Sequence, residues 1–528
     1  MSTVAPVEVS APPPPAAPSS PPAVAAFGIR LATGLAGVLL AVVIAQINDH
    51  VAEAALPDLR GALGLSVDQG LWFQTWYQVT QVCAMMFAPW CSATFSIRRF
   101  TMSAVGVFAV LAVILSCLPT DTAPAFVMAL RAAQGLAGGC LPPMLMTVAL
   151  RFLPPGIKLY GLGAYALTAT FAPNLGTPLA ALWLEGFGWR FAFLQVVPLC
   201  ALSIAMVCYG LPQDPLRLER FRQFDWLGVL LGLPAMAMLV IVLEQGTHLG
   251  WTDSPMIVTM ALSSVVLFVC FFINEWSHPL PFFKIQLLAR RNLTHGLICV
   301  GGVLVILVAL PGLPANYLAE VWHYRPLELS PLALCVALPQ LIALPAVAAL
   351  CNLRRVDCRW VLATGLALLF ACCALGSFMS ADWIRDNFII LQVIQVAAQP
   401  MSVIPLLMLA TNGMSPAEGP FASSWFNTVK GLAGVVGAAV TEGVVTMRER
   451  VHSNVLVDHL GNALAVVRPH LSGDGQPLAR LAATVHEQAL VLASADVFRL
   501  MGIIALLLVL LTALLPTRIF PPRPAAGA

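Results

Sequence analysis

The chain has 528 residues, of which 59% are hydrophobic and only 10% charged, and its mean hydropathy is +0.86. Soluble domains carry about 25% charged residues, so this composition indicates an integral membrane protein. Apolar runs of roughly 20 residues, enough to cross about 30 Å of hydrocarbon, recur from Phe27 to Leu515 and exclude a large soluble catalytic domain. The net charge of +2 gives no reason to expect nucleic acid as a partner. The lipid bilayer is the expected surrounding.

Both ends of the chain are predicted to be tails outside the membrane. Residues 1–27 contain runs such as "APPPPAAPSSPP" and lack the basic and short apolar regions of a signal peptide, which predicts a disordered cytoplasmic tail. Residues 517–528 are expected to form a second cytoplasmic tail.

Apolar windows and their breakers predict fourteen membrane-spanning helices in a pattern of six, two and six. They lie near 28–50, 70–92, 101–118, 124–150, 158–183, 190–211, 225–243, 255–276, 293–318, 329–350, 360–379, 387–411, 420–444 and 495–516. The expected units are an N-terminal bundle at 28–211, two linker helices at 212–292, and a C-terminal bundle at 293–516.

Basic residues predict the orientation of these helices, because short cytoplasmic loops carry an excess of Lys and Arg. With the N-terminus inside, the inner side holds Arg30, Arg98, Arg99, Arg151, Lys158, Arg217, Arg220, Arg222, Lys284, Arg290, Arg291, Arg354, Arg355, Arg359, Arg518 and Arg523. The short outer loops hold only Arg60, Arg190, Arg325 and Arg385. Both termini are therefore predicted to be cytoplasmic. Residues 446–494 then form a long outer loop, in which "ARLAATVHEQALVLASADVF" is typical of an amphipathic helix lying on the membrane or contacting a partner.

Four charged residues fall within or at the ends of predicted spans: Asp49, Glu53, Arg131 and Lys430. A charge in the bilayer interior costs at least about 2.5 kcal/mol and normally faces a partner or a water-filled cavity. Interfacial placement of the carboxylates, and snorkelling of the basic residues, are the alternatives. The first span rises outward and the fourth descends inward, so Arg131 is expected at the depth of Asp49 and Glu53. A nearby arginine favours the ionised form of a carboxylate, whereas burial disfavours it, so a carboxylate next to Arg131 could be protonated reversibly. This predicts a proton-coupling site.

Small residues and prolines within the spans predict close packing and kinks. "GLAGG" (Gly135–Gly139) and "GLAGVVGAA" (Gly431–Ala439) let helix backbones approach closely. Prolines interrupt several spans, as in transporters near substrate cavities. They are Pro142, Pro143, Pro173, Pro178, Pro400 and Pro405.

Polar residues in the spans are the candidates for lining a substrate cavity between the bundles. They are Gln74, Trp76, Tyr77, Gln78, Gln81, Gln134, Asn174, Gln395, Gln399, Asn427 and Lys430. The alternative for the second span is polar packing between helices. The 13 cysteines lie mostly in apolar runs, which favours packing over a disulfide framework. The histidines form no ligand pattern, and neither a metal nor a cofactor is expected.

The layout and several motifs resemble the fourteen-span drug:proton antiporters of the major facilitator superfamily, the EmrB/QacA type. "LRAAQGLAGG" is similar to the motif of the fourth span, with Arg131, Gln134 and Gly135 in place. "APNLGTPLAALWLEGFGWRFAFLQVVP" resembles the antiporter motif and its continuation, with Pro173, Gly176, Trp189, Arg190 and Pro198 matching. "LRRVDCRWVL", "SPAEGPFASSWFNTVKGLAGVVGAA" and "ASADVFRL" resemble later landmarks of this family in order.

The sequence also departs from the family's pattern, which indicates a divergent member. Asn48 stands where the family's first span has Asp, with Asp49 next to it. "CSATFSIRRF" keeps the basic pair Arg98 and Arg99 of the gating loop but lacks its Asp and glycines. Lys430 takes the place of a common arginine, and Ala172 and Thr177 stand where glycine is usual.

The resemblance implies an all-α major facilitator fold of two six-helix bundles, with two extra helices between them, in the inner membrane. It implies export of small organic or drug-like compounds in exchange for protons, driven by the proton gradient. A periplasmic HlyD-type adaptor with an outer-membrane channel is the implied partner of the outer loop. The alternatives are transport of one dedicated metabolite, a transport-like sensor or scaffold, and a membrane enzyme. The absence of convergent acid, base, nucleophile and metal groups in the sequence disfavours an enzyme.

Overall fold

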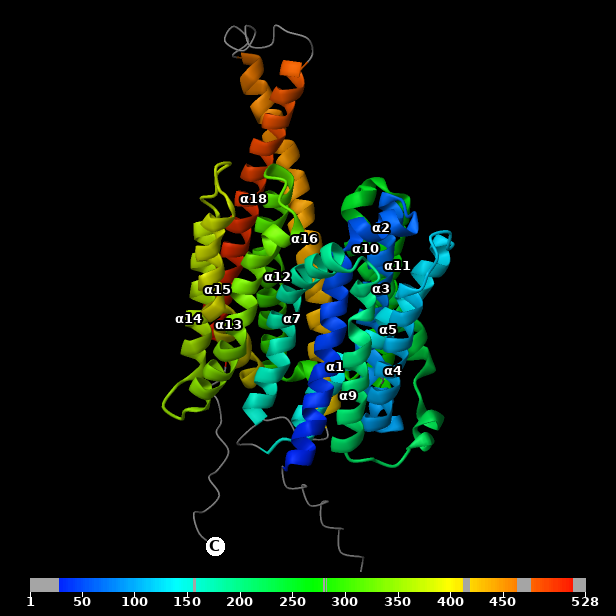
Figure 1. Cartoon of the computed structure of the whole chain (residues 1–528). Helices are drawn as coiled ribbons and strands as arrows, with labels where there is room; N and C mark the ends of the chain where they lie inside the picture. Colours follow the sequence, from blue (N-terminus) through cyan, green and yellow to red (C-terminus); the bar gives the residue numbers. More distant parts are fainter. Residues whose placement is uncertain are drawn as a thin grey trace, which may run out of the picture.

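The computed structural model describes residues 28–154, 158–278, 281, 283–411, 418–462 and 476–515. The tails predicted at 1–27 and 517–528 lie outside the described residues. Throughout these ranges the regular structure is helical, with no strand (Figure 1). The predicted all-α membrane fold is confirmed.

The N-terminal bundle contains the helices that carry most of the candidate coupling residues. They are α1 (Ile29–Ala54), α2 (Leu56–Leu63), α3 (Val67–Phe95), α4 (Ile97–Ser116), α5 (Pro124–Gly139), α6 (Leu141–Phe152), α7 (Lys158–Gly186), α8 (Phe191–Leu194) and α9 (Val196–Gly210). α1 begins at the lower end of the molecule in Figure 1 and rises to the upper end. These two ends are called lower and upper below.

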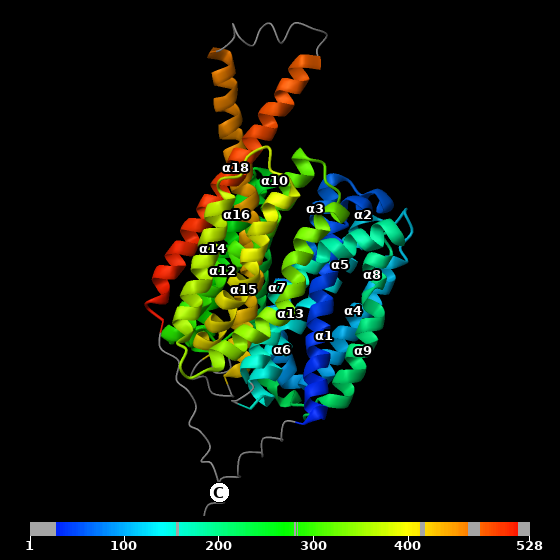
Figure 2. The same ribbon diagram turned by 60° about the vertical axis from the view of Figure 1, so that its left-hand side comes forward.

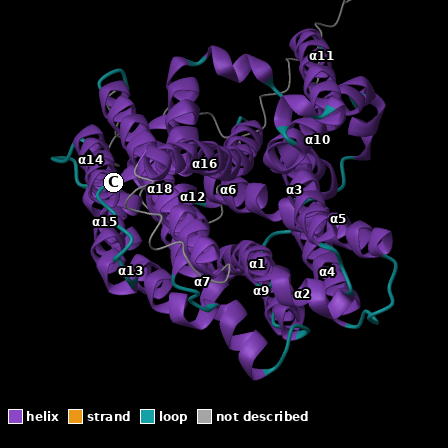
Figure 3. Cartoon of the chain, turned by 90° about the horizontal axis from the view of Figure 1, so that it is seen from above, coloured by secondary structure: helices purple, strands orange, loops and turns teal. Residues whose placement is uncertain are grey.

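The second bundle follows two helices that stand outside the central pair of bundles. Those two are α10 (Trp226–Leu249) and α11 (Pro255–Ser277), and α10 packs against α3 and α16. The second bundle contains α12 (Arg291–Val321), α13 (Pro326–Asn352), α14 (Cys358–Gly376), α15 (Arg385–Ala410), α16 (Gly419–Asn462) and α18 (Gln476–Thr512). Figure 3 shows the two bundles facing each other, with α10 and α11 at the periphery beside α3.

Helices occupy all fourteen predicted ranges. Among the described residues, twelve segments are long and apolar enough to cross a membrane. The other two long helices, α3 and α7, have 29 residues each. α3 is less apolar because it carries Gln74, Gln78 and Gln81 toward the interior of the protein, where polar side chains find partners rather than lipid.

The predicted span at 124–150 is not one helix. α5 ends at Gly139 and α6 begins at Leu141, with Cys140 between them. Pro142 and Pro143 follow at once, and a proline has no N–H to continue the hydrogen bonding of a preceding helix. They therefore start a new helix, whereas the prolines predicted to kink α7 and α15 lie inside continuous helices.

The outer segment predicted at 446–494 is largely helical, and the helix predicted within it at 479–498 is part of α18. α16 continues to Asn462 and α18 starts at Gln476, so the two helices project beyond the bundles and diverge at the upper end (Figure 2). At 1.5 Å per residue, the 44 residues of α16 extend about 66 Å, far more than the roughly 30 Å of hydrocarbon. The fall in hydropathy after the span marks an exit from lipid, while residues such as Met447, Arg448 and Glu449 still favour helix. We call residues 446–462 and 476–494 the stem.

Ion pairs join α16 and α18 at and just below the base of the stem. Asp496 of α18 accepts a hydrogen bond from Nε of Arg448 at 2.6 Å, and Nε2 of His452 lies 2.8 Å from the same carboxylate. Glu449 of α16 lies 2.8 Å from Nδ1 of His486 on α18. The stem is therefore a structured extension of the second bundle.

Candidate functional site

The predicted contact between Arg131 and a carboxylate of the first span is present between α5 and α1. Nη2 of Arg131 lies 3.3 Å from Oδ1 of Asp49, and the two side chains are 0% and 4% exposed. Asp49 lies five residues before the end of α1, about 8 Å along the helix axis from the upper end. The pair is thus a buried ion pair in the upper half of the N-terminal bundle.

Three glutamines surround this pair and form hydrogen bonds with both of its charged groups. Gln74 donates to Oδ1 of Asp49 at 3.0 Å, and Gln78 donates to Oδ2 at 3.2 Å. Nη1 of Arg131 donates to Gln134 at 2.8 Å, and Nη2 donates to Oε1 of Gln74 at 3.4 Å. The glutamines come from α3 and α5, so the network joins three helices. We call these five residues the coupling cluster, after the coupling role that the sequence predicts for Asp49 and Arg131.

Aromatic rings of α3 pack against the guanidinium group. Its central carbon lies 3.8 Å from the ring centroid of Tyr77 and 5.2 Å from that of Phe73. A desolvated cation over an aromatic face gains about 2 kcal/mol, so these rings compensate part of the burial of Arg131. Gln81, one turn beyond Tyr77, is 4% exposed and does not join the network.

Glu53 does not contact Arg131. It lies 3.2 Å from Nδ1 of His50, and its side chain is 57% exposed. Glu53 is one turn closer to the end of α1 than Asp49, where the helix leaves the interior of the bundle. The prediction left open which carboxylate faces Arg131, and the geometry selects Asp49.

The residue at the family's Asp position is buried but does not belong to the coupling cluster. Asn48 is 0% exposed, and its amide nitrogen and oxygen have no hydrogen-bond partner among the described residues. Adjacent residues on a helix point in directions about 100° apart. Asp49 therefore occupies a face that Asn48 does not share.

The antiporter motif on α7 packs directly behind the coupling cluster. A side chain at Gly176 would collide with Cβ of His50, the residue after Asp49. Gly176 thus lets α7 approach α1 at the level of the ion pair. Pro173 lies one turn earlier, inside α7, and Asn174 donates to the Thr170 carbonyl at 2.6 Å rather than to another helix.

The basic pair predicted in a gating loop lies at the lower end, far from the coupling cluster. Arg98 and Arg99 belong to the first turn of α4. This helix begins at Ile97, directly after Ser96, whose φ is 77°. Nη2 of Arg98 donates to Sγ of Cys208 on α9 at 3.1 Å. Arg98 therefore connects α4 with the end of α9.

α10 brings a carboxylate that the sequence interpretation did not single out. Glu244 lies near enough to Asp49 and Glu53 for their charges to interact. The next residue, Gln245, is 2% exposed and donates to Oγ1 of Thr75 on α3 at 2.6 Å. This contact places α10 beside the glutamines of α3. The signal that could have revealed Glu244 is a lone acidic residue within an apolar span of 24 residues.

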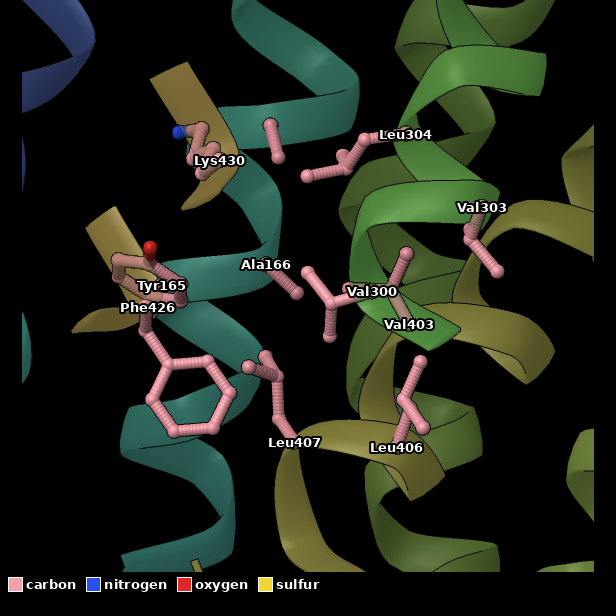
Figure 4. A pocket seen from close by; sticks show the side chains of 11 residues that line it. Tyr165, Ala166, Val300, Val303, Leu304, Val403, Leu406, Leu407, Phe426 and Lys430 are labelled. Carbon is pink, nitrogen blue, oxygen red and sulfur yellow. The ribbon is translucent and has the colours of Figure 1, made fainter. Parts of the chain in front are cut away.

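A small cavity, with room for no more than about a water molecule, lies between α7 of the first bundle and α12, α15 and α16 of the second (Figure 4). Its walls are the rings of Tyr165 and Phe426, aliphatic side chains of α12 and α15, and Lys430. Of the predicted cavity residues, only Lys430 lines it. Nζ of Lys430 donates to Oγ1 of Thr168 at 3.3 Å.

Gln395 and Gln399 lie elsewhere in the second bundle, in a buried chain of amides. Gln399 donates to Gln395 at 3.1 Å, and Gln395 donates to Gln392 at 3.1 Å. Gln340 of α13 donates to Gln399 at 3.4 Å. The chain links α13 to α15 and does not line the cavity between the bundles.

Asn427 lies behind the cavity wall. Its oxygen accepts from the Tyr165 hydroxyl at 3.0 Å, and its nitrogen donates to the Ser423 carbonyl at 2.7 Å. The side chain is 0% exposed. Asn427 therefore orients Tyr165 and has no free surface in the cavity.

The chain is similar to export and resistance proteins of several bacteria. Residues 38–313 match the family model described as Major Facilitator Superfamily. The multidrug export protein EmrB of Haemophilus influenzae is 25% identical, covering 89% of this chain and 93% of EmrB. The fatty acid resistance protein FarB of Neisseria gonorrhoeae is 24% identical, with the same shares of both chains covered.

A solved structure has the same fold. The human organic anion transporter MFSD10 superimposes with a TM-score of 0.57 and 12% sequence identity, covering 91% of this chain and 100% of that one. The family match, the arrangement of the bundles and the motifs at the coupling cluster agree. The chain belongs to the major facilitator superfamily of membrane transporters, as a divergent member of the EmrB type.

Proposed function

We propose that this protein is a proton-coupled secondary transporter that exports small organic or drug-like compounds by alternating access. The observation that carries the proposal is the buried Asp49–Arg131 pair at the junction of α1, α3 and α5. The names of the multidrug and fatty acid resistance relatives support small organic compounds as cargo. The proton gradient is the proposed energy source, without a cofactor.

Protonation of Asp49 would change the contacts of three helices at once. A charged Asp49 accepts from Gln74, Gln78 and Arg131, and these hydrogen bonds are stronger when the acceptor is ionised. A neutral Asp49 leaves Arg131 as a buried charge without a counter-charge, which is costly. Arg131 is then driven toward another partner or toward water. Proton binding is thereby linked to a rearrangement of α1 against α3 and α5.

The contact between the two bundles provides the surface across which such a rearrangement acts. Nearer the lower end, the Ser423 hydroxyl donates to the Pro143 carbonyl at 2.8 Å, and the Ser424 hydroxyl donates to the Met86 carbonyl at 2.8 Å. These contacts join α16 to α6 and α3. Rocking of one bundle against the other would break them and open the cavity at this end.

Transport in proteoliposomes tests the proposal. The purified full chain is reconstituted, a pH gradient is imposed, and accumulation is measured for a panel of anionic, neutral and cationic organic compounds. We expect at least one compound to move against its concentration only while the gradient lasts. Equal accumulation with and without the gradient for every compound would exclude proton coupling.

We propose that the lower end faces the cytoplasm of a cell with the protein in its inner membrane, because the basic residues of the short loops gather there. Single-cysteine labelling on a cysteine-free background checks this orientation. A cysteine at Arg220 is expected to be protected from an impermeant outside reagent, and one at Asp458 in the stem is expected to react. Outside labelling at position 220 with protection at position 458 would reverse the orientation.

We propose that the stem is the contact for a periplasmic HlyD-type adaptor that leads to an outer-membrane channel. Met447, Val451 and Val455 repeat every four residues along α16 and are 61%, 42% and 46% exposed. An apolar stripe at this spacing is the pattern that pairs one helix with another. In addition, α16 is longer than a helix needs to be to cross the bilayer, so the stem projects out of the membrane.

Replacing Met447, Val451 and Val455 by glutamate is expected to lower the amount of adaptor that co-purifies at least tenfold relative to wild type. The protein should still reach the membrane, because these side chains lie outside the hydrocarbon. The exposed Asn454 on the same helix provides the matched control, and Asn454→Glu should retain the adaptor. Undiminished co-purification with the triple variant would rule out this stripe as the contact.

A further inference from the structure

The two helices between the bundles are attached to α3 of the first bundle. Sγ of Cys83 on α3 donates to the Leu233 carbonyl of α10 at 3.6 Å. Just before α10, the ring centroid of Phe224 lies 4.3 Å from that of Trp90, near the lower end of α3. Figure 3 shows α10 alongside α3, and α11 packs on α10 in turn. The pair of helices is therefore held on the first bundle from the middle of α3 to its lower end.

The segment that follows α11 is fixed to the end of that helix. We call residues 283–290 the strap. The backbone N–H of Phe283 donates to Oε2 of Glu275 at 3.1 Å, and Nε2 of Gln286 donates to the Trp276 carbonyl at 3.0 Å. Both acceptors belong to the last turn of α11. The strap is thus connected through α11 and α10 to the first bundle.

The strap also binds the start of α16 in the second bundle. Nε1 of Trp425 donates to the Lys284 carbonyl at 3.0 Å, and the ring centroids of Trp425 and Phe283 lie 4.3 Å apart. Nη2 of Arg290 lies 2.7 Å from Oε1 of Glu418, the residue before α16 begins. The strap therefore touches both bundles at the lower end of the molecule.

Trp425 lies next to the two residues that join the bundles at this end. Ser423 donates to the Pro143 carbonyl and Ser424 to the Met86 carbonyl, and we call these two contacts the lower gate. Successive residues of a helix point in directions about 100° apart. The serines accordingly face the first bundle while Trp425 faces the strap.

These contacts form a closed ring that runs from α3 through α10, α11, the strap and α16, and returns to α3 through the lower gate. Separating α16 from α3 and α6 at the lower end breaks the ring at a second place, because α10 and α11 are attached to α3. The link between the strap and α16 consists of side-chain contacts at one helix end, whereas α10 packs along α3. We therefore expect the second break at this link. Contacts that are made in only one state stabilise that state.

An indole at the end of a spanning helix can instead anchor the protein in the headgroup layer, where tryptophan is common. Trp360 at the lower end of α14 is 73% exposed and suits that role. Trp425 differs because it is half-buried and its N–H donates to a backbone carbonyl of the protein. The polar atom of this indole is thus used inside the protein.

We propose that Trp425 latches the lower gate closed by binding the strap, and that α10 and α11 thereby take part in alternating access. Trp425 is a positioning residue, because it acts through the placement of α16. This inference rests on the proposed alternating access and adds a role for the two helices between the bundles. A hydrogen bond and an aromatic pair each change an equilibrium by roughly two- to tenfold. Losing both should favour the state with an open lower end at least fivefold.

Distances between spin labels on the two bundles test the latch. The labels are attached to cysteines at Glu219 and Arg355, which are exposed at the lower end of the first and the second bundle. The full chain without its native cysteines is placed in lipid nanodiscs, and double electron–electron resonance gives the ratio of longer to shorter distances. Trp425→Leu should raise this ratio at least fivefold over wild type. Gln286→Ala should raise it as well, because it loosens the strap from α11.

Matched variants separate the latch from a membrane anchor. Trp425→Phe keeps the ring contact without the N–H and should lie between wild type and Trp425→Leu. Trp360→Leu removes an exposed indole from the same end and should leave the ratio unchanged. Thermal unfolding verifies that each variant is folded.

Two results would overturn the latch and leave alternating access standing. One is a wild-type protein that shows both distances while folded Trp425→Leu has the same ratio. The other is an equal shift in Trp360→Leu and Trp425→Leu. A single short distance in every variant and at every pH would contradict alternating access together with the latch, so the two failures are distinguishable.

Discussion

Replacing Arg131 by alanine is expected to abolish transport driven by a pH gradient. The substitution leaves Asp49 buried at 4% exposure without its counter-charge, and removing one member of a buried pair costs roughly 3–5 kcal/mol. The charged form of Asp49 then has no counter-charge beside it, and the linkage between proton exchange at Asp49 and the position of Arg131 is lost. Arg131→Lys should retain part of the transport, because it keeps the charge but loses the planar group that contacts Asp49, Gln74 and Gln134 together.

The companion variant Asp49→Asn should stop gradient-driven transport while substrate binding stays measurable, because asparagine keeps the size of the side chain and loses the titratable group. Glu53→Gln serves as the matched control, since Glu53 contacts His50 instead of Arg131. The double variant Asp49→Leu with Arg131→Met separates folding from coupling. Replacing a whole buried pair by apolar residues often leaves stability intact, so this variant should fold and not transport. Normal transport by both Arg131→Ala and Asp49→Asn would refute the mechanism.

Replacing Gly135 by leucine is expected to destabilise the N-terminal bundle and to remove transport. A Cβ at this position of α5 would lie 2.9 Å from Cα of Tyr77 on α3, closer than non-bonded carbon atoms approach. Overpacking of this kind costs about 1–3 kcal/mol or more. The displacement would also move Arg131, one turn earlier on α5, away from the ring of Tyr77.

Gly106→Leu is the matched control for this prediction. Gly106 lies within α4, and a Cβ there would meet nothing within 4 Å. Leucine favours helix over glycine by nearly 1 kcal/mol, so the control should fold at least as well as wild type. Thermal unfolding and gradient-driven uptake measure both variants. A Gly135→Leu protein that unfolds at the wild-type temperature and transports normally would show that α3 and α5 need no close contact there.

Part of the coupling cluster could be predicted because depth in a membrane follows from position along the chain. Each residue of a spanning helix advances about 1.5 Å, and the direction alternates from one span to the next. These two facts put Arg131 at the level of Asp49 and Glu53 before any contact was known. They leave open the direction each side chain takes around its helix axis, which depends on how the helices pack. The glutamines of α3 were predicted as cavity lining, and packing placed Gln74 and Gln78 on Asp49 instead.

By itself the sequence determined the membrane class, the positions of fourteen helices and the glycines of α5 as packing residues, since length and hydropathy govern insertion and small residues govern close approach. Only the tertiary structure decided that Asp49 and not Glu53 meets Arg131, that Glu244 of α10 lies near this pair, and that Lys430 lacks a carboxylate among its described neighbours. It also decided that α16 continues without a break through residues 446–462. The physical reason is that these contacts join side chains from helices far apart in the sequence. The rotation of each helix about its own axis, which decides where its side chains point, is fixed by packing. For α16, the end of the apolar run marks where the helix leaves the lipid. The helix then continues into water because the residues that follow still favour helical structure.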